Sequence, residues 1–302
     1  MLPVLAACAD AEKTPAVVAE TRVVPVVIGR LEDGNIREAS GLARSQNQDN
    51  VLWVINDNGA GEWVHAINPR GKRLGEFDLK KSDNKDWEDL ASFRLDDKPY
   101  ILVADIGDND ARRKTRTLYV VEEPTVAKSD KANIDWRIDF RYPDGPRDAE
   151  SAAVDIDNRR AFVLTKRDIP PVLYELPLRP DTDRKITARW LGTIKSLPAP
   201  SRRDVEFAPK TKNWHWQPVG MDISDDNRAA VILTYRAVYY YTREPDQDWF
   251  DALNTRPTRV SIGNFRNAEA IAFGDSGRRV VVTGENKNSL LLLIDFDGAD
   301  AE

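Results

Sequence analysis

Hydrophobic and polar residues alternate in short runs along this chain, and the runs fall into five groups. Each group opens with an acidic or polar residue that leads into a small apolar segment. Alternation of this kind, rich in β-branched residues and bounded by Gly, Pro, Asn and Asp, is typical of half-buried strands. The opening segments are EASGLA at 38–43, DWEDLA at 86–91, DAESAAV at 148–154, QPVGMDI at 217–223 and NAEAIAF at 267–273.

Recurrence of one unit over nearly the whole chain predicts a radial array of small sheets, because a single unit cannot bury its apolar faces alone. In the first unit we expect strands at 41–43, 51–56, 63–68 and 74–79, separated by turns that contain Gly59 and Gly71. The later groups repeat this order, with a third-unit outer strand expected at 186–194. We therefore predict an all-β fold, in which residues 22–302 form one β-propeller domain of five four-stranded blades.

The fifth group lacks an outer strand of its own. A β-rich run at 22–31 (RVVPVVIGRL) is left over at the other end of the chain, and it would supply that strand and close the ring. Closure removes the exposed strand edges of an open sheet. A six-bladed ring is the alternative, because residues 195–216 are too many for a simple connection.

Alignment of the five groups brings one residue of each into a single column, which we expect to face the central axis. Carboxylates held close together cannot all stay ionised without a counter-charge. An oxygen-only donor set favours Ca²⁺ or another hard cation, with backbone carbonyls or water completing the shell. A channel in which Arg pairs with the carboxylates, or a misread register, remains open. The column, and hence the expected metal site, is Ser40, Glu88, Glu150, Val219 and Glu269.

Hairpins between the second and third strands of each blade should return to the face where the inner strands begin. Candidate catalytic residues on these hairpins are Asp57 and Asp105, which would orient or deprotonate water, and Arg113, Lys166 and Arg236, which would neutralise charge on a substrate. The basic run of Arg112, Arg113 and Arg116 could clamp a phosphate through bidentate hydrogen bonds, although such a run is more often a solvated face.

Composition limits the partners and the metals. Asp and Glu number 50 against 44 Lys and Arg, so nucleic acid is not expected to bind. Two histidines and one cysteine cannot make the usual zinc ligand sets. No stretch approaches the roughly 20 apolar residues that span a bilayer.

The cysteine, Cys8, follows Leu5-Ala6-Ala7, and this LAAC resembles the lipobox of bacterial lipoproteins. Only seven residues precede it, without the basic segment of an ordinary signal peptide, so an accidental cysteine in a leader is the alternative. On the lipoprotein interpretation, residues 1–21 are a leader and tether, and Cys8 is lipidated. The protein would then face the periplasm of the bacterial cell envelope or be secreted, with membrane association only through that lipid.

The column resembles that of the calcium-activated nucleotidases, or apyrases, which are five-bladed propellers with Ca²⁺ in the central channel. Their inner strands use Ser, Glu, Glu, Ser and Glu, and Val219 stands here in place of the second serine. The similarity continues through SGLARSQNQDNVLWVINDNGAG at 40–61, which implies a catalytic-site role for Asp57. The long blade insertions of that family have no counterpart. The chain also resembles uncharacterised bacterial envelope propeller lipoproteins with DWED and DIGDN motifs, found here at 86–89 and 105–109.

Two functions are consistent with these features. The first is a Ca²⁺-dependent hydrolase of phosphate esters, anhydrides or similar anionic substrates, acting at the mouth of the central channel; an ester or lactone would suit the same groups. The second is a non-catalytic envelope lipoprotein with a structural calcium that binds a protein or glycan partner. A propeller scaffold hosts many activities and does not choose between them.

Overall fold

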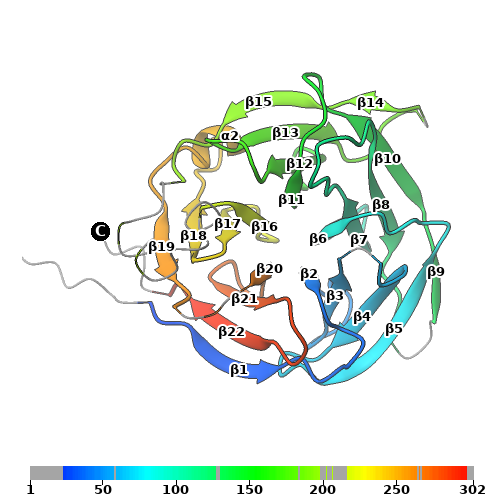
Figure 1. Ribbon diagram of the computed structural model, residues 1–302, viewed down its shortest axis with the longest axis vertical. Helices are drawn as coiled ribbons and strands as arrows, with labels where there is room; N and C mark the ends of the chain where they lie inside the picture. Colours follow the sequence, from blue (N-terminus) through cyan, green and yellow to red (C-terminus); the bar gives the residue numbers. More distant parts are fainter. Residues whose placement is uncertain are drawn as a thin grey trace, which may run out of the picture.

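The computed structural model describes residues 23–57, 59–126, 130–182, 184–197, 202, 206, 216–263, 265 and 267–297. Over these residues the chain forms five sheets arranged as blades around a common axis, and the four main strands of each blade pair antiparallel (Figure 1). The first strand of each blade lies innermost in the ring. The predicted five-bladed β-propeller is confirmed, and the six-bladed alternative does not hold for the described part of the chain.

The five blades follow one another in sequence. Blade I comprises β2 (Ala39–Arg44), β3 (Leu52–Asn56), β4 (Trp63–Ile67) and β5 (Arg73–Lys80), and blade II β6 (Trp87–Leu95), β7 (Lys98–Asp105), β8 (Arg116–Glu122) and β10 (Trp136–Arg141). Blade III comprises β11 (Ala149–Asp155), β12 (Arg160–Thr165), β13 (Val172–Pro177) and β15 (Arg189–Thr193), and blade IV β16 (Pro218–Ile223), β17 (Ala229–Thr234), β18 (Ala237–Thr242) and β19 (Thr258–Ser261). Blade V comprises β20 (Ala268–Phe273), β21 (Arg279–Gly284) and β22 (Leu290–Asp295), with β1 as its outer strand.

The outer strand of blade V comes from the start of the described chain. β1 (Val26–Arg30) pairs antiparallel with β22, from Val26 opposite Leu293 to Arg30 opposite Leu290. The predicted closure of the ring by this run is therefore confirmed. The long segment at 195–216, on which the six-bladed alternative rested, falls mostly outside the described residues.

Two short strands link neighbouring blades at the rim. β9 (Lys131–Asn133) leaves the connection between β8 and β10 and pairs in parallel with β5 of blade I. β14 (Ile186–Thr187) leaves blade III and pairs in parallel with β10 of blade II. The single strand expected at 186–194 is thus divided at Ala188, because its two ends satisfy backbone groups of different blades. Each added strand covers an edge that would otherwise be open.

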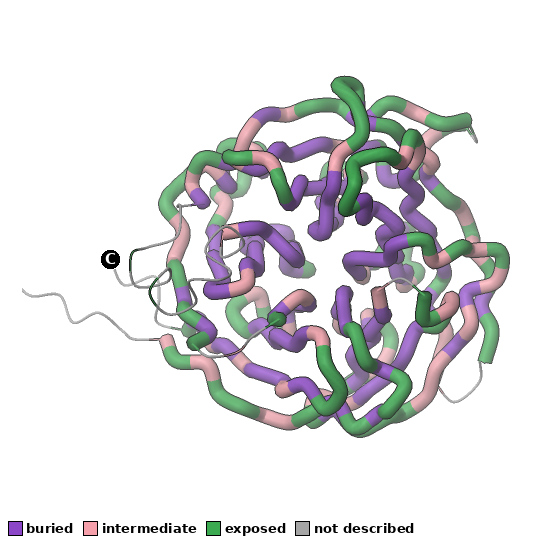
Figure 2. The backbone as a smooth tube through the Cα atoms, in the orientation of Figure 1, coloured by how far each residue is buried: buried purple, intermediate pink, exposed green. Residues whose placement is uncertain are grey.

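The hydrophobic core lies between blades rather than at the centre of the ring. Five clusters of buried apolar side chains occur among the described residues, each shared by two adjacent blades. Figure 2 shows that buried residues follow the strands around the centre of the ring, whereas exposed ones lie mainly at the rim and in the loops. Between blades III and IV the four-residue helix α2 (Trp249–Ala252) adds Trp249, whose indole N–H donates to Asn227 Oδ1 at 2.9 Å. The inner strand of each blade packs against a neighbouring blade on both of its faces. Most of its residues are therefore buried, and its backbone is held in place around the axis.

Cys8 and the expected leader at 1–21 lie outside the described residues. Among the residues that are described, no helix has the length and apolar character needed to cross a membrane.

Candidate functional site

The five column residues share one backbone feature, a β-bulge at the start of the inner strand. In every blade the pairing between the first and second strands skips one inner-strand residue. A bulge re-aims a side chain and is frequent next to functional sites. The skipped residues are Ser40 in blade I, Glu88 in blade II, Glu150 in blade III, Val219 in blade IV and Glu269 in blade V.

A second set of equivalent positions lies beside this column, except that Ile106 of this set packs in the core between blades II and III. These residues directly follow the second strand of each blade, opposite the bulge. Side-chain contacts join the two sets, so the second-to-third hairpins lie on the same face as the inner-strand starts. We call this face the axial face. The second set is Asp57, Ile106, Lys166, Tyr235 and Glu285.

Three carboxylates from two blades converge on the axial face. Asp57, Asp86 and Glu88 each place an oxygen so that all three lie within 4.8 Å of one another. Burial raises the pKa of Glu88 well above its ordinary value, and Glu150, Asp57 and Asp86 raise it further. A group of acids this close is electrostatically unfavourable when ionised, and a cation would relieve that cost.

Gly107 forms one wall of this acid triad. A Cβ at position 107 would overlap Glu88 Oε1 and stand 2.6 Å from Asp86 Oδ2. The missing side chain therefore leaves the space that the two carboxylates occupy. This close approach requires a residue without a Cβ.

The other two glutamates of the column have partners of their own. Glu150 forms a buried ion pair with Lys166, whose ammonium also stands 5.4 Å from the ring centroid of Tyr235. Burial raises the pKa of Glu150 to about 7 despite the opposing charge of Lys166. Tyr235 donates its hydroxyl to Glu269 Oε1 at 2.9 Å, and burial together with Glu150 and Glu285 raises the pKa of Glu269.

Ser40 and Val219 were expected to surround one ion together with the glutamates. In the structure each of them makes a different contact. Ser40 donates its hydroxyl to the backbone carbonyl of Trp87 at 2.8 Å and so joins blades I and II. Val219 packs in the hydrophobic cluster between blades IV and V. A ligand role for either residue stays a prediction.

Asp105 and Arg113 lie behind the acid triad. Asp105 is 1% exposed, accepts the backbone N–H of Asp86 at 3.1 Å and pairs with Arg113 at 2.8 Å. Burial raises the pKa of Asp105 to about 6, against the pull of Arg113. Both side chains thus hold Asp86 in place. Arg236, in the hairpin of blade IV, donates to the carbonyl of Gly263 at 2.6 Å.

A pocket of about 600 Å³ opens beside the axial face on blade I. Its lining includes Asn56, which directly precedes Asp57, together with Trp63, Arg37 and Glu38. This volume is within the roughly 300–1,000 Å³ typical of small-molecule sites. His65 and Glu76 of its lining form a second group of possible metal ligands with Asp33, and Arg73 already bridges this group at 3.0 Å to Asp33 and 2.9 Å to Glu76.

Sequence reasoning missed the roles of Tyr235 and Asp86 on the axial face. The repeat could have identified Tyr235, because this residue directly follows the second strand of its blade, as Asp57 and Lys166 do in theirs. Asp86 precedes the bulge of blade II, and nothing in its local sequence indicates that its carboxylate turns toward Asp57 of blade I.

Comparison with known proteins supports the fold and no particular activity. No protein-family model and no curated protein sequence matches the chain. Among solved structures, the major allergen Mala s 1 of Malassezia sympodialis is 9% identical, with 87% of this chain and 95% of that chain covered and a TM-score of 0.54. A likeness at this identity shows a shared architecture alone.

Two further solved structures are similar at lower scores. A luciferin-regenerating enzyme is 10% identical over 90% of this chain and 95% of its own, with a TM-score of 0.46. The PQQ-bound aldose sugar dehydrogenase of Streptomyces coelicolor is 10% identical over 90% and 98%, with a TM-score of 0.44. Neither carries an argument about function.

Proposed function

We propose that the axial face binds a divalent cation of the Ca²⁺ class and hydrolyses phosphate esters or anhydrides. The observation that carries this proposal is the convergence of Asp57, Asp86 and Glu88 within 4.8 Å of one another. Asp57 is on the hairpin of blade I, whereas Glu88 is the bulged residue of blade II and Asp86 lies two residues before it. The resemblance to the apyrases, in the column and around Asp57, points to the same class of reaction.

The donor chemistry of the triad fits a hard cation. All three groups are carboxylates, and Ca²⁺ takes 6–8 oxygen ligands, commonly including water and backbone carbonyls. Asp86 and Glu88 are 7% and 6% exposed, so their charges are poorly solvated without a cation. The space beside Gly107 lets the two carboxylates sit side by side. Zinc is disfavoured because no nitrogen or sulfur ligand belongs to this triad.

When bound, such a cation would polarise a phosphoryl oxygen and so make the phosphorus more open to attack. Within the chain, Asp57 is the partly exposed member of the triad and is the residue we propose to orient the attacking water. Lys166 supplies a positive charge next to the triad, where it would offset charge on the substrate. Asp105 and Arg113 act as positioning residues for Asp86. The pocket beside Asn56 has room for the leaving group.

The test begins with protein stripped by a chelator and returned to Ca²⁺ or Mg²⁺. A Ca²⁺-selective rise in the melting temperature is expected, since a ligand at about 100 times its dissociation constant adds about 2.7 kcal/mol to the free energy of unfolding. Turnover of nucleotides and simple phosphate esters is then measured with Ca²⁺ present. Asp57→Asn and Glu88→Gln should each lose turnover, and Glu88→Gln should also lose most of the Ca²⁺ shift.

Asp110→Asn is the matched control, because Asp110 lies on the neighbouring hairpin and pairs at the surface with Arg112 at 3.4 Å. It should retain both turnover and the Ca²⁺ shift. A Glu88→Gln variant that keeps the wild-type Ca²⁺ response would contradict the metal site. An Asp57→Asn variant that keeps wild-type turnover would contradict the proposed role of Asp57.

The second candidate function is a non-catalytic envelope lipoprotein whose cation is structural and whose loops bind a protein or glycan. Internal pairing favours it, because Lys166 neutralises Glu150 and Tyr235 donates to Glu269. On this alternative, Ca²⁺ raises the melting temperature, yet no substrate is turned over.

Lipidation of Cys8 is tested separately by labelling with a fatty acid in bacteria. Cys8→Ser should lose the label and should no longer appear in the membrane fraction. A variant that keeps both would refute lipidation at Cys8.

A further inference from the structure

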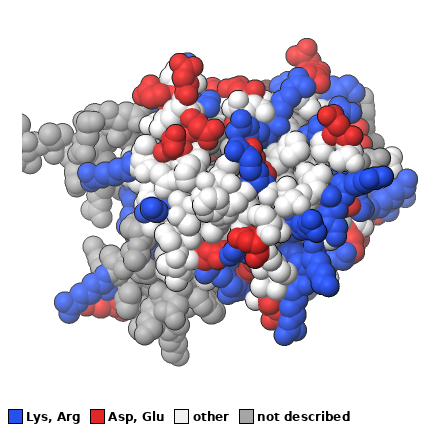
Figure 3. Space-filling view, turned by 90° about the horizontal axis from the view of Figure 1, so that it is seen from above, with Lys and Arg blue, Asp and Glu red and all other residues white. Residues whose placement is uncertain are grey.

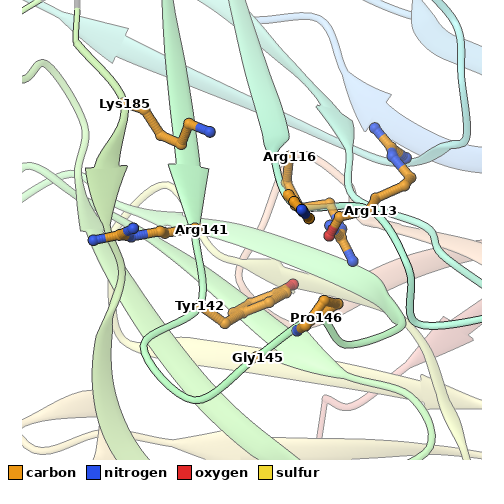
Figure 4. A pocket seen from close by; sticks show the side chains of 8 residues that line it. Arg113, Arg116, Arg141, Tyr142, Gly145, Pro146 and Lys185 are labelled. Atoms are coloured by element: carbon orange, nitrogen blue, oxygen red, sulfur yellow. The ribbon is translucent and has the colours of Figure 1, made fainter.

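A basic pocket lies on blade II, on the side toward blade III. It has a volume of about 250 Å³, and five of its eight lining residues are Lys or Arg, with no acidic residue among them. The hairpin before β8, the turn after β10 and the residue before β14 form its walls. In Figure 3 Lys and Arg side chains gather on the side of the molecule where β10 and β14 lie. The lining is Arg113, Lys114, Arg116, Arg141, Tyr142, Gly145, Pro146 and Lys185 (Figure 4).

Three of the cations lack an acidic partner within the described part of the chain. Arg141 donates to the hydroxyl of Thr187 at 3.1 Å, and Lys185 donates to the hydroxyl of Thr115 at 2.7 Å. No ion pair involves these two or Lys114 there. Hydroxyl partners leave the charges uncompensated, and each side chain keeps further N–H groups for an anion.

Arg116 makes the pocket wall rigid. Its side chain is 1% exposed and is held by Asp108 at 2.6 Å and by the carbonyl of Arg147 at 2.7 Å. A buried guanidinium fixed from several sides keeps its position without a ligand. Because Asp108 already compensates its charge, Arg116 contributes a fixed wall rather than a free charge to the pocket.

Tyr142 supplies a buried hydroxyl with no hydrogen-bond partner among the described residues. Its ring is 5% exposed and packs on Phe140 and Tyr174, with the Arg116 guanidinium carbon 5.6 Å from the ring centroid. Figure 4 shows the hydroxyl turned toward the side of the pocket from which Arg113 and Arg116 come. Burial raises the pKa of Tyr142, so the hydroxyl stays protonated and able to donate. A buried unpaired hydroxyl is unfavourable, and a hydrogen bond to a ligand would remove that cost.

We propose that this pocket is a binding site for a phosphate group, with the Tyr142 hydroxyl as a hydrogen-bond donor and with Arg141 and Lys185 among the lining residues whose positive charge attracts the anion. A dianionic oxyanion matches several uncompensated cations and can accept several hydrogen bonds at once. The volume is below the roughly 300–1,000 Å³ of drug-sized sites, so the ligand is inorganic phosphate or a small phosphate monoester. Nothing in this proposal depends on the acid triad or on a metal.

The experiment measures binding of inorganic phosphate to the full chain by calorimetry and by melting temperature, with chelator present and ionic strength matched with chloride. Phosphate should bind saturably, sulfate should compete, and acetate should have little effect. Glycerol phosphate in place of phosphate distinguishes a monoester site from one for the free ion. An Arg141→Gln, Lys185→Gln double variant should bind phosphate at least tenfold more weakly.

Tyr142→Phe separates a ligand role from a packing role. Without phosphate it should be as stable as the wild type or more so, because it loses only a buried hydroxyl that has no partner. With phosphate it should bind about five- to tenfold more weakly, as expected for one lost hydrogen bond to an anion. Lys72→Gln, which removes an exposed charge on blade I, is the matched control and should bind as the wild type does. Unchanged phosphate binding by Tyr142→Phe, or equal loss in Lys72→Gln, would overturn the proposal.

Discussion

The carboxyl group of Asp89, on the inner strand of blade II, accepts the backbone N–H of Met221, on the inner strand of blade IV, at 3.1 Å. The same oxygen accepts the N–H of Ala152 in blade III at 2.8 Å, and the other oxygen accepts the N–H of Leu90 at 2.9 Å. One fully buried side chain thus joins the inner strands of three blades across the axis. Asp89 follows the bulged Glu88, so the bulge turns one acid to the axial face and the next into the ring.

Asp89→Ala should destabilise the fold strongly, because it leaves buried N–H groups of three blades without an acceptor. Each such group costs about 1–3 kcal/mol, so the free energy of unfolding should fall by on the order of 3 kcal/mol or more. Urea unfolding measures this change. Asp89→Asn should be less severe, since its amide oxygen still accepts on one side. If Asp89→Ala unfolds at the wild-type urea concentration, the carboxyl group does not join the blades as described.

Gly107→Ala should impair the cation response that we propose for the axial face. Its Cβ would overlap Glu88 Oε1 and approach Asp86, so both carboxylates must move. We expect the Ca²⁺-induced rise in melting temperature to shrink to less than half. Gly34→Ala is the control, because a Cβ there meets nothing within 4 Å and the backbone of neither glycine has a positive φ. Equal Ca²⁺ responses in the two variants would argue against this geometry.

Asp222 should make the protein less stable as the pH rises through the acidic range. Its pKa in the folded state is raised to about 7 from an ordinary 3.8, chiefly by burial. Between these values the folded state holds a proton that the unfolded state releases. The free energy of unfolding therefore decreases with rising pH in that window, and this group causes no further change with pH below or above it.

Asp222→Asn should reduce this dependence, because an amide does not titrate. The measurement is urea unfolding of both proteins at about pH 4 and about pH 8. We expect the wild type to lose more stability between the two conditions than the variant. The same loss in both proteins would show that Asp222 keeps an ordinary pKa.

Removal of β1 should open the ring. A variant lacking residues 1–30 loses the pairing of β1 with β22 and exposes the edge of blade V. We expect a loss on the order of 3 kcal/mol, from several backbone hydrogen bonds, and a tendency to associate through the bare edge. Melting temperature and light scattering report the two effects. A variant lacking only residues 1–22 is the control and should match the full chain, since β1 remains.

Local patterns along the chain predicted the architecture. Short apolar runs rich in β-branched residues, such as 51–56 and 278–284, predict strands, and the repeat of such runs makes a ring of blades the arrangement that buries their apolar faces. The unassigned run at 22–31 matched the missing strand of blade V for the same reason. Alignment of Ser40 with the three glutamates and Val219 also identified the bulged positions, because a bulge is a local feature that repeats with the unit.

Only the tertiary structure decided which side chains meet. Asp57 lies beside Asp86 and Glu88 of another blade. Lys166 pairs with Glu150, and Asp89 accepts a hydrogen bond from the backbone of Met221, which is 132 residues away. The repeat pattern contains no information on such pairs, since their geometry depends on how neighbouring blades twist and pack. The phosphate pocket around Tyr142 has the same origin, because its walls come from three separate stretches of chain. The sequence by itself therefore determined the ring and the bulged positions of its inner strands, and packing between blades decided the chemistry of those positions.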